Sequence, residues 1–307
     1  MSLEAQVRRR GTVALKRVAR RCGVEVVRRD RYDVVRHDVY SPVPDVARLP
    51  PDLWDRRDPL AGIALDVDAA LSLVETELAP FVAEFDFPRD GPRPPGEFYL
   101  CNDNFEAVDS ELLYAVVRAR RPQRVVELGS GYTSLLIGAA SRRNAAEGTP
   151  TVHVAYDPYP RPQVLGHPVA EPTVVVPTSA ADVPLEVFAS LGAGDVLFVD
   201  TTHTVKVGSE VVHVILDVLP ALQPGVLVHF HDIFLPWAYP REWLEEHQWY
   251  WAEEYLLQAF LAFNDGFEIL LPAQAMARDR PERLAAAIPS FVAGAGVGPA
   301  SLWLVRR

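Results

Sequence analysis

The sequence contains only two cysteines, Cys22 and Cys101, which lie far apart and show none of the close spacings typical of metal sites. This argues against a disulfide framework and favours a reducing, cytoplasmic location. The chain also lacks any apolar run near the ~20 residues that cross a bilayer. Its N-terminus has no apolar stretch of the kind found in secretory signal peptides. We therefore expect a globular protein without a membrane span.

Lysine is nearly absent, with 2 lysines against 28 arginines, which is typical of GC-rich bacterial genomes. The net charge is −11, yet residues 1–36 carry a net +7, so the remainder carries −18. Apolar residues punctuate this basic segment at Val7, Val13, Leu15 and Val18, as in an amphipathic surface helix. We predict a solvated or partner-docking helix here and no nucleic-acid partner, because the rest of the chain is acidic.

The first hundred residues show mixed local patterns. A short strand and turn are predicted at 24–35, and a helix at 66–85 on the spacing of its apolar residues. Proline-rich stretches flank that helix at 41–54 and 87–98. Asp109 has the position of an N-cap for a further helix, which Pro122 ends. We interpret residues 1–106 as an N-terminal extension that caps the acceptor side of the site.

From residue 124 onward, strands alternate with helical segments. Strands are predicted at 124–128, 151–157, 173–177, 195–200 and 225–232, with a later pair at 267–271 and 301–305 that adds an edge. Nearly continuous runs of Val, Leu and Phe indicate strands buried on both faces, and therefore a mostly parallel sheet. The pattern predicts a doubly wound α/β fold, in which ligands bind at the carboxyl ends of the strands.

Glycine or polar residues follow four of these strands. They are Glu127 with Gly129, Ser130 and Gly131 after the first strand, Asp157 after the second, Asp200 after the fourth, and His231 with Asp232 after the fifth. Core packing does not explain this set. The sequence therefore predicts a ligand pocket at this edge of the sheet.

The turn after the first strand indicates which ligand binds. A dinucleotide fingerprint needs Gly or Ala where this chain has Ser134, and Glu127 would repel a pyrophosphate. A carboxylate suits instead an adenosine with a zwitterionic 5′ substituent, such as S-adenosylmethionine. Asp157 is then placed to accept hydrogen bonds from the ribose hydroxyls. An NAD-type oxidoreductase and a non-catalytic nucleotide-binding module remain as alternatives.

The chain resembles class I S-adenosylmethionine-dependent methyltransferases, and most closely a bacterial branch that acts on small molecules. The resemblance covers roughly residues 102–251 and rests on the segments "VVELGSGYTS", "VAYDPYP", "LFVDTTHTVKVGSEV" and "GVLVHFHDIFLPWAYPREW". It implies a seven-stranded Rossmann-like methyltransferase sheet within a domain at 107–307, with an aromatic-rich insert at 234–256. That insert either packs as a structural element or forms a lid over the acceptor.

The resemblance also implies roles for individual residues. Glu127, Gly129, Ser130 and Gly131 match the motif that surrounds the methionine part of the cofactor, Asp157 the ribose ligand, and Asp182 the adenine contact. Asp200 and His203 match the loop that borders cofactor and acceptor. His231 and Asp232 stand where metal-dependent relatives have an Asp-Asn pair.

Methyl transfer to a hydroxyl needs a general base or an acidifying metal ion. We predict that His231 is the base, assisted by Asp232 and His203, because imidazole titrates near neutral pH. Mg²⁺ or Mn²⁺ held by Asp200, His231 and Asp232 is the less favoured alternative. His229 is interpreted as a core histidine. The expected acceptor is a hydroxyl of a sugar or secondary metabolite, and a homo-oligomer is compatible with the sequence.

Overall fold

The computed structural model describes residues 24–28, 32–36, 40–166 and 172–307. Contacts divide the chain into two compact units. One comprises Met1–Arg56 with Ala238–Tyr250, and the other comprises Arg57–Trp237 with Trp251–Arg307. The basic helix predicted around Val7, Val13, Leu15 and Val18 lies outside the described residues. No helix of the described residues is both long and apolar enough to span a membrane.

In the smaller unit, β1 (Val24–Arg28) pairs antiparallel with β2 (Tyr32–Arg36), where the sequence predicted a short strand and a turn. Two short helical turns follow, η1 (Val46–Arg48) and η5 (Trp243–His247). The Arg241 guanidinium lies 5.0 Å from the ring centroid of Trp54, so the proline-rich segment and the aromatic segment contact each other within this unit. Part of the predicted insert at 234–256 therefore groups with the N-terminal segment.

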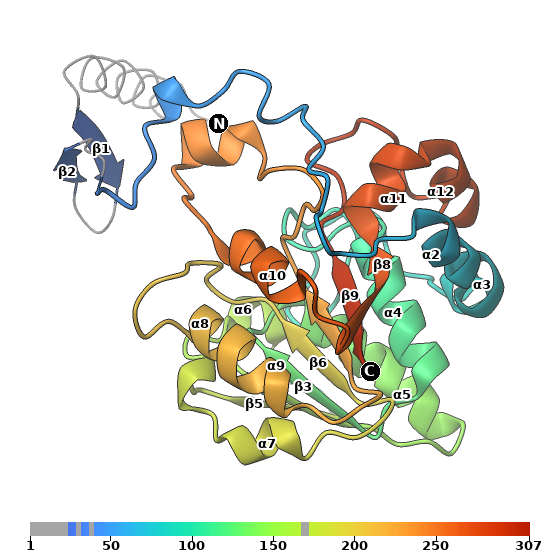
Figure 1. Cartoon of the computed structure of the whole chain (residues 1–307). Helices are drawn as coiled ribbons and strands as arrows, with labels where there is room; N and C mark the ends of the chain where they lie inside the picture. The colour runs from blue at the N-terminus through green and yellow to red at the C-terminus, as the bar shows by residue number, and fades with distance from the viewer. Residues whose placement is uncertain (1–23, 29–31, 37–39, 167–171) are drawn as a thin grey trace. The chain divides into compact units, whose positions relative to one another are not determined.

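The larger unit is built on a seven-stranded sheet with the order β5-β4-β3-β6-β7-β9-β8 (Figure 1). Its strands are β3 (Arg124–Leu128), β4 (Val152–Tyr156), β5 (Thr173–Val176), β6 (Val196–Val199), β7 (Leu227–Phe230), β8 (Phe267–Pro272) and β9 (Leu302–Arg306). The strand β9 is antiparallel to both of its neighbours, and the other pairs are parallel. The predicted doubly wound, mostly parallel seven-stranded sheet is confirmed.

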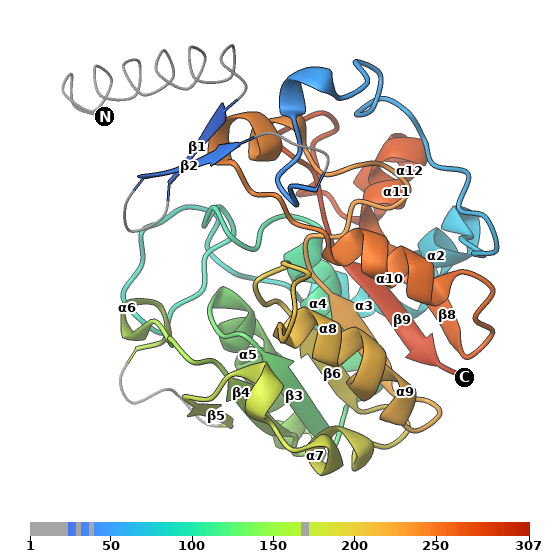
Figure 2. The same ribbon diagram turned by 60° about the vertical axis from the view of Figure 1, so that its left-hand side comes forward.

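Helices cover both faces of this sheet, as Figure 2 shows. On one face lie α4 (Asp109–Arg120) and α5 (Tyr132–Ala146), with α11 (Ala273–Asp279) and α12 (Pro281–Ala287). On the other lie α7 (Leu185–Ala189), α8 (Glu210–His213), η4 (Val214–Val218), α9 (Leu219–Ala221) and α10 (Glu253–Leu261). Successive strand residues alternate between the two cores, as with Val125 and Val126. The short turns α6 (Pro162–Leu165) and η3 (Ala180–Asp182) complete the unit.

The predicted helix at 66–85 is present in three consecutive parts, namely α2 (Val67–Leu73), η2 (Val74–Leu78) and α3 (Ala79–Ala83). Its apolar residues Leu71, Val74 and Leu78 are fully buried in the same core as α4 and α5. Residues 57–106 thus belong to the unit that contains the sheet. The division of the chain at residue 106, and a capping role for the residues before it, stay predictions.

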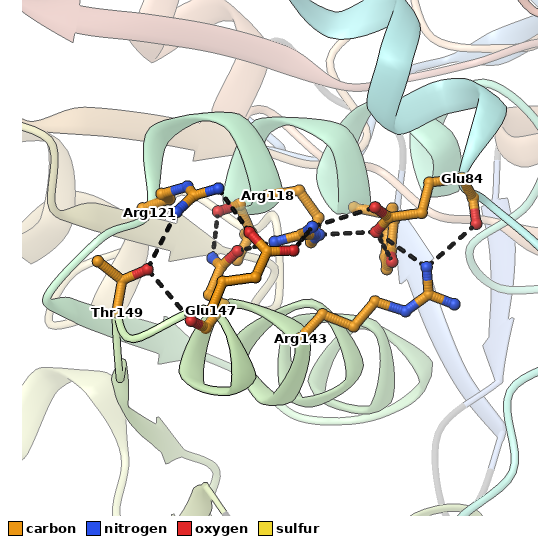
Figure 3. Close-up of polar contacts among 9 residues, drawn as sticks. Glu84, Arg118, Arg121, Arg143, Glu147 and Thr149 are labelled. Carbon is orange, nitrogen blue, oxygen red and sulfur yellow. Dashed lines mark hydrogen bonds and ion pairs between the residues drawn. The ribbon is translucent and has the colours of Figure 1, made fainter.

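An ion network joins the end of α3 to α4 and α5 (Figure 3). The Arg118 side chain is buried and donates to both oxygens of Glu84, to Glu147 and to Asn144. Hydrogen bonding from Arg118 lowers the pKa of Glu84 to about 2, although partial burial acts in the opposite direction. The network therefore joins the C-terminal ends of α3, α4 and α5.

Candidate functional site at the carboxyl ends of the strands

The turn between β3 and α5 needs glycine at its first position. Gly129 has φ +97°, a left-handed conformation that L side chains rarely adopt. A Cβ there would lie 2.1 Å from the backbone oxygen of Asp200, at the end of the neighbouring strand β6. The backbones after β3 and β6 can approach this closely only because residue 129 has no side chain.

The Glu127 carboxylate supports this turn from inside the protein. It is fully buried, and it accepts hydrogen bonds from Thr133 Oγ1 (2.5 Å) and Ser134 Oγ (2.7 Å) in the first turn of α5. The buried ring of His153 contacts it at 2.9 Å through Nε2, while its Nδ1 contacts Thr173. Through these contacts Glu127 holds the turn in place, and its direct contact with a cofactor stays a prediction.

Asp157 faces the same turn from the end of β4. Its Oδ2 accepts a hydrogen bond of 2.5 Å from Ser130 Oγ, and its Oδ1 accepts one of 2.7 Å from the Tyr159 backbone. The residue is half-buried, so the carboxylate borders solvent beside the glycine turn. Asp182 is exposed at the end of η3, beyond β5. The structure thus pairs Asp157 with the turn, while the role of Asp182 stays a prediction.

Acids and histidines gather where β6 and β7 end. His203 Nε2 lies 3.3 Å from Asp200 Oδ1 and 3.4 Å from Asp232 Oδ2. His231 Nδ1 lies 3.5 Å from Asp232 Oδ1 and 3.9 Å from Asp200 Oδ1. The side chains of Asp200 and Asp232 are 35% and 16% exposed, so the two carboxylates form the open side of the cluster. All four were predicted as site residues, and the fold brings them together.

His203 is buried and held on several sides. Its Nδ1 lies 2.8 Å from Glu253 Oε2, and its ring packs against Trp251 at a centroid distance of 4.4 Å. Its backbone oxygen accepts from the amides of Ala252 and Glu253, where α10 begins. These contacts fix a residue with φ +55°, which a non-glycine residue keeps only where its surroundings impose it.

Charge in the cluster is set by the competition between burial and ion pairing. Burial acts to lower the pKa of His203, but hydrogen bonds to Asp200 and Glu253 raise it well above 6.5. Burial also opposes protonation of His231, yet the nearby Asp232, Asp200 and Asp109 raise its pKa to about 9. Burial would raise the pKa of Asp200, but its contacts with His203 and the charge of His231 lower it to about 2. The ionised pairs therefore persist at neutral pH.

The sequence did not reveal two members of this cluster, Asp109 and Glu253. Asp109 was predicted to cap α4, which is wrong, because the N-cap is Val108 and Asp109 is the first helical residue. Its carboxylate instead accepts from the backbone amides of Ala300 (2.8 Å) and Ser301 (3.0 Å), and it lies 3.8 Å from His231 Nε2. No strand-end position marks either residue, so only the folded structure shows them.

The other strand histidine is a core residue. His229 is fully buried, stacks on Phe198 at a centroid distance of 4.0 Å, and bonds through Nε2 to Ser301 Oγ at 2.8 Å. Burial and the positive charge on His231 lower its pKa well below 6.5. A neutral histidine with these partners packs the sheet, as the sequence predicted, and leaves His231 as the histidine at the strand end.

The residues Asp200, His231 and Asp232 also fit a divalent cation. Each offers one ligand atom, and these three atoms lie within 4.8 Å of one another. Two carboxylate oxygens and one imidazole nitrogen suit Mg²⁺ or Mn²⁺. However, the two carboxylates already share the positively charged ring of His203, which reduces their attraction for a further cation.

Residues 126–233 match the family profile of a methyltransferase domain. The matched segment runs from β3 through β7 and includes the glycine turn, Asp157 and the strand-end histidines. The resemblance to methyltransferases seen in the sequence is therefore confirmed for this part of the chain.

Comparisons with whole proteins add little to this family match. No curated protein matches the sequence significantly. Two solved structures share the general arrangement at 16% identity. One is the O-methyltransferase TomG from Streptomyces achromogenes, which is involved in tomaymycin synthesis and was solved in complex with SAM. The match covers 80% of this chain and 92% of TomG, at a TM-score of 0.42. The match to the apo structure of CmcI-N160 covers 72% of this chain and 86% of that protein, at a TM-score of 0.39. At these scores neither structure supports a functional argument.

Proposed function

We propose that the protein transfers a methyl group from S-adenosylmethionine to a hydroxyl of a small molecule. The observation that carries this proposal is the position of the acid–histidine cluster. It lies at the ends of β6 and β7, within the methyltransferase domain and directly beside the glycine turn that follows β3. A cofactor on that turn would present its methyl group to an acceptor on the cluster side. We also expect a cytoplasmic location and, as acceptors, sugars or secondary metabolites.

The reaction is an in-line displacement at a sulfonium methyl group, and S-adenosylmethionine supplies the chemical driving force when it is bound. The protein then has two tasks, which are to align the acceptor hydroxyl and to take its proton. Ser130 and Asp157 hold the cofactor side, and Asp200 and Asp232 border the acceptor side. The deprotonated form of His231 takes the proton.

Asp109 determines which nitrogen of His231 is available. It lies behind the ring on the Nε2 side, at 3.8 Å, and is itself fixed by two backbone amides. Nδ1 faces the more open side of the cluster, toward Asp232 and Asp200. A carboxylate behind one nitrogen orients the ring and stabilises it when it gains a proton at the other. We therefore assign proton acceptance to Nδ1.

A metal-dependent reaction is the second candidate, because Asp200, His231 and Asp232 fit a divalent ion. Such an ion would acidify the acceptor hydroxyl and orient it. Asp109 would then fix the imidazole ligand from behind, as carboxylates commonly do for metal-bound histidines. We favour the general base, since the His203 ring already provides positive charge between the two carboxylates.

Calorimetric titration of the purified protein with S-adenosylmethionine, S-adenosylhomocysteine and NAD tests the cofactor assignment. We expect saturable binding of the first two and none of NAD. Binding of NAD alone would overturn the proposal in favour of an oxidoreductase. Release of S-adenosylhomocysteine in the presence of hydroxylated acceptors, with and without a chelator, would then separate the general base from the metal.

A further inference from the structure

We propose that Arg161 binds the carboxylate of the methionine part of S-adenosylmethionine. This inference rests on the proposed function and adds a cofactor-binding residue to it. It also assigns each end of one loop to a different part of the cofactor, with Asp157 at the ribose and Arg161 at the amino-acid end.

The position of Arg161 carries the first step. Three residues separate it from Asp157, and the segment between them runs along the glycine turn after β3. Ser130 of that turn donates to Asp157 Oδ2 at 2.5 Å. At the next residue, a Cβ built on Gly131 would lie 3.0 Å from a terminal guanidinium nitrogen of Arg161. Two adjacent turn residues therefore face an acid and a base of the same segment.

The partners of Arg161 carry the second step. Most arginines in the described part of the larger unit form ion pairs, such as Arg118 with Glu84 and Arg283 with Glu75. Among the described residues Arg161 has no carboxylate within ion-pair distance. Its one hydrogen bond there is a long contact of 3.4 Å to Asn104 Oδ1. The guanidinium is exposed, so most of its donors are available to a ligand.

The positive charge of Arg161 acts on Tyr132, the first residue of α5. Burial raises the pKa of Tyr132 to about 12, with help from its hydrogen bond to Tyr99, while the Arg161 charge acts to lower it. Tyr132 directly follows Gly131. This places the positive charge of Arg161 over the turn where the resemblance puts the methionine part of the cofactor.

The chemistry of the ligand carries the last step. At neutral pH S-adenosylmethionine has one anionic group, which is the carboxylate of its methionine part. A guanidinium binds a carboxylate through two parallel hydrogen bonds, a geometry that an ammonium group cannot reproduce. Asp157 is an acceptor and suits the ribose hydroxyls, whereas Arg161 is only a donor and suits the carboxylate.

Calorimetric titration with two ligands tests this assignment. S-adenosylmethionine and its decarboxylated analogue differ in the carboxylate alone. We expect the wild-type protein to prefer the first, and Arg161→Met to weaken S-adenosylmethionine binding at least tenfold, because the variant loses the charged hydrogen bonds to the carboxylate. Binding of the decarboxylated analogue should stay within twofold. Arg161→Lys should recover only part of the affinity.

Arg93→Met is the matched control, because Arg93 is an exposed arginine of the same unit whose Nε donates to the Asp90 backbone oxygen. It should leave both affinities unchanged. Unchanged S-adenosylmethionine affinity in Arg161→Met, or an equal loss for both ligands in a variant with wild-type thermal stability, would overturn the assignment. Failure of the wild-type protein to bind either ligand would instead overturn the proposed function itself.

Discussion

At the scale of single residues, the Asp157 carboxylate already has two protein partners, Ser130 Oγ and the Tyr159 amide. Each oxygen keeps acceptor capacity, because a carboxylate oxygen accepts two hydrogen bonds. Replacing Asp157 with Ala removes the two charge-assisted bonds expected to the ribose, each worth about 1.5–3 kcal/mol. S-adenosylmethionine affinity, measured by calorimetry, should fall at least tenfold. An affinity that is unchanged in Asp157→Ala would place the ribose elsewhere.

His231 provides a test of the chemical step. Removing a positioned general base costs about 10²–10⁴-fold in rate and leaves ligand binding intact. We therefore expect His231→Ala to keep its affinity for S-adenosylmethionine and lose turnover, measured as release of S-adenosylhomocysteine with an acceptor found by screening. Since the pKa of His231 is raised to about 9, the ring is protonated at neutral pH. The wild-type rate should then rise between pH 7 and 9, and this rise should be absent from the variant.

The metal-dependent alternative predicts a different pattern. A chelator would abolish wild-type activity, and Mg²⁺ or Mn²⁺ would restore it. Turnover that persists both in His231→Ala and in the presence of a chelator would contradict both mechanisms, and alignment of the two substrates would have to account for the rate.

How far the sequence reveals the site also depends on the residue. Asp157, Asp200, His231 and Asp232 follow strands directly, and the carboxyl ends of parallel strands meet at one edge, so their proximity was predictable. Glu253 begins a helix, and no local pattern says which strand end that helix reaches. Its contact with His203 depends on tertiary packing alone. The same holds for Asp109, whose partners Ala300 and Ser301 are about 190 residues away in the sequence.

At the scale of elements, all seven strands of the sheet were predictable because each is a short apolar run between turn signals. The order of the last two was not. The strand β9 lies between β7 and β8 and runs antiparallel to both. Its apolar residues Leu302 and Leu304 would be buried equally well at the edge, so hydrophobic pattern does not distinguish the two orders. The pairing of β9 with β7 and β8 determines the order, and no local sequence pattern indicates that pairing.

The ion network between α3, α4 and α5 makes a prediction at the same scale (Figure 3). The pKa of Glu84 lies at about 2 in the folded protein, below its ordinary value of 4.5. A depressed pKa means that Glu84 stabilises the fold fully above pH 4.5, and that this contribution is lost as the pH falls toward 2. Glu84→Gln should therefore lower the free energy of unfolding by about 1–3 kcal/mol at pH 7. The difference from wild type should shrink steadily below pH 4.5 in urea titrations.

Glu77→Gln is the comparison for this network, because Glu77 forms an exposed pair with Arg120. Exposed ion pairs contribute little, so its effect should be smaller at every pH. A difference between Glu84→Gln and wild type that stays constant down to pH 3 would show that the carboxylate acts through packing and not through its charge.

At the scale of the whole molecule, the two units predict different consequences of truncation. Every sequence motif of the proposed cofactor site lies from residue 125 onward, and the larger unit begins at Arg57. Deleting residues 1–36 should therefore leave S-adenosylmethionine affinity within about twofold of wild type, measured by calorimetry. A truncated protein that stays folded but no longer binds the cofactor would contradict this and would assign the N-terminal segment to the cofactor site.

Deleting residues 1–106 should have the opposite result. That truncation removes α2 and η2, whose Leu71, Val74 and Leu78 are fully buried against α4 and the sheet. Each such side chain contributes about 1.5–3 kcal/mol, and a domain is stable by only about 5–15 kcal/mol in total. We expect this shorter protein to lose its cooperative thermal unfolding transition, and cofactor binding with it. If it unfolded cooperatively near the wild-type temperature, residues 57–106 would be a detachable cap, and the sheet with its helices would be stable without them.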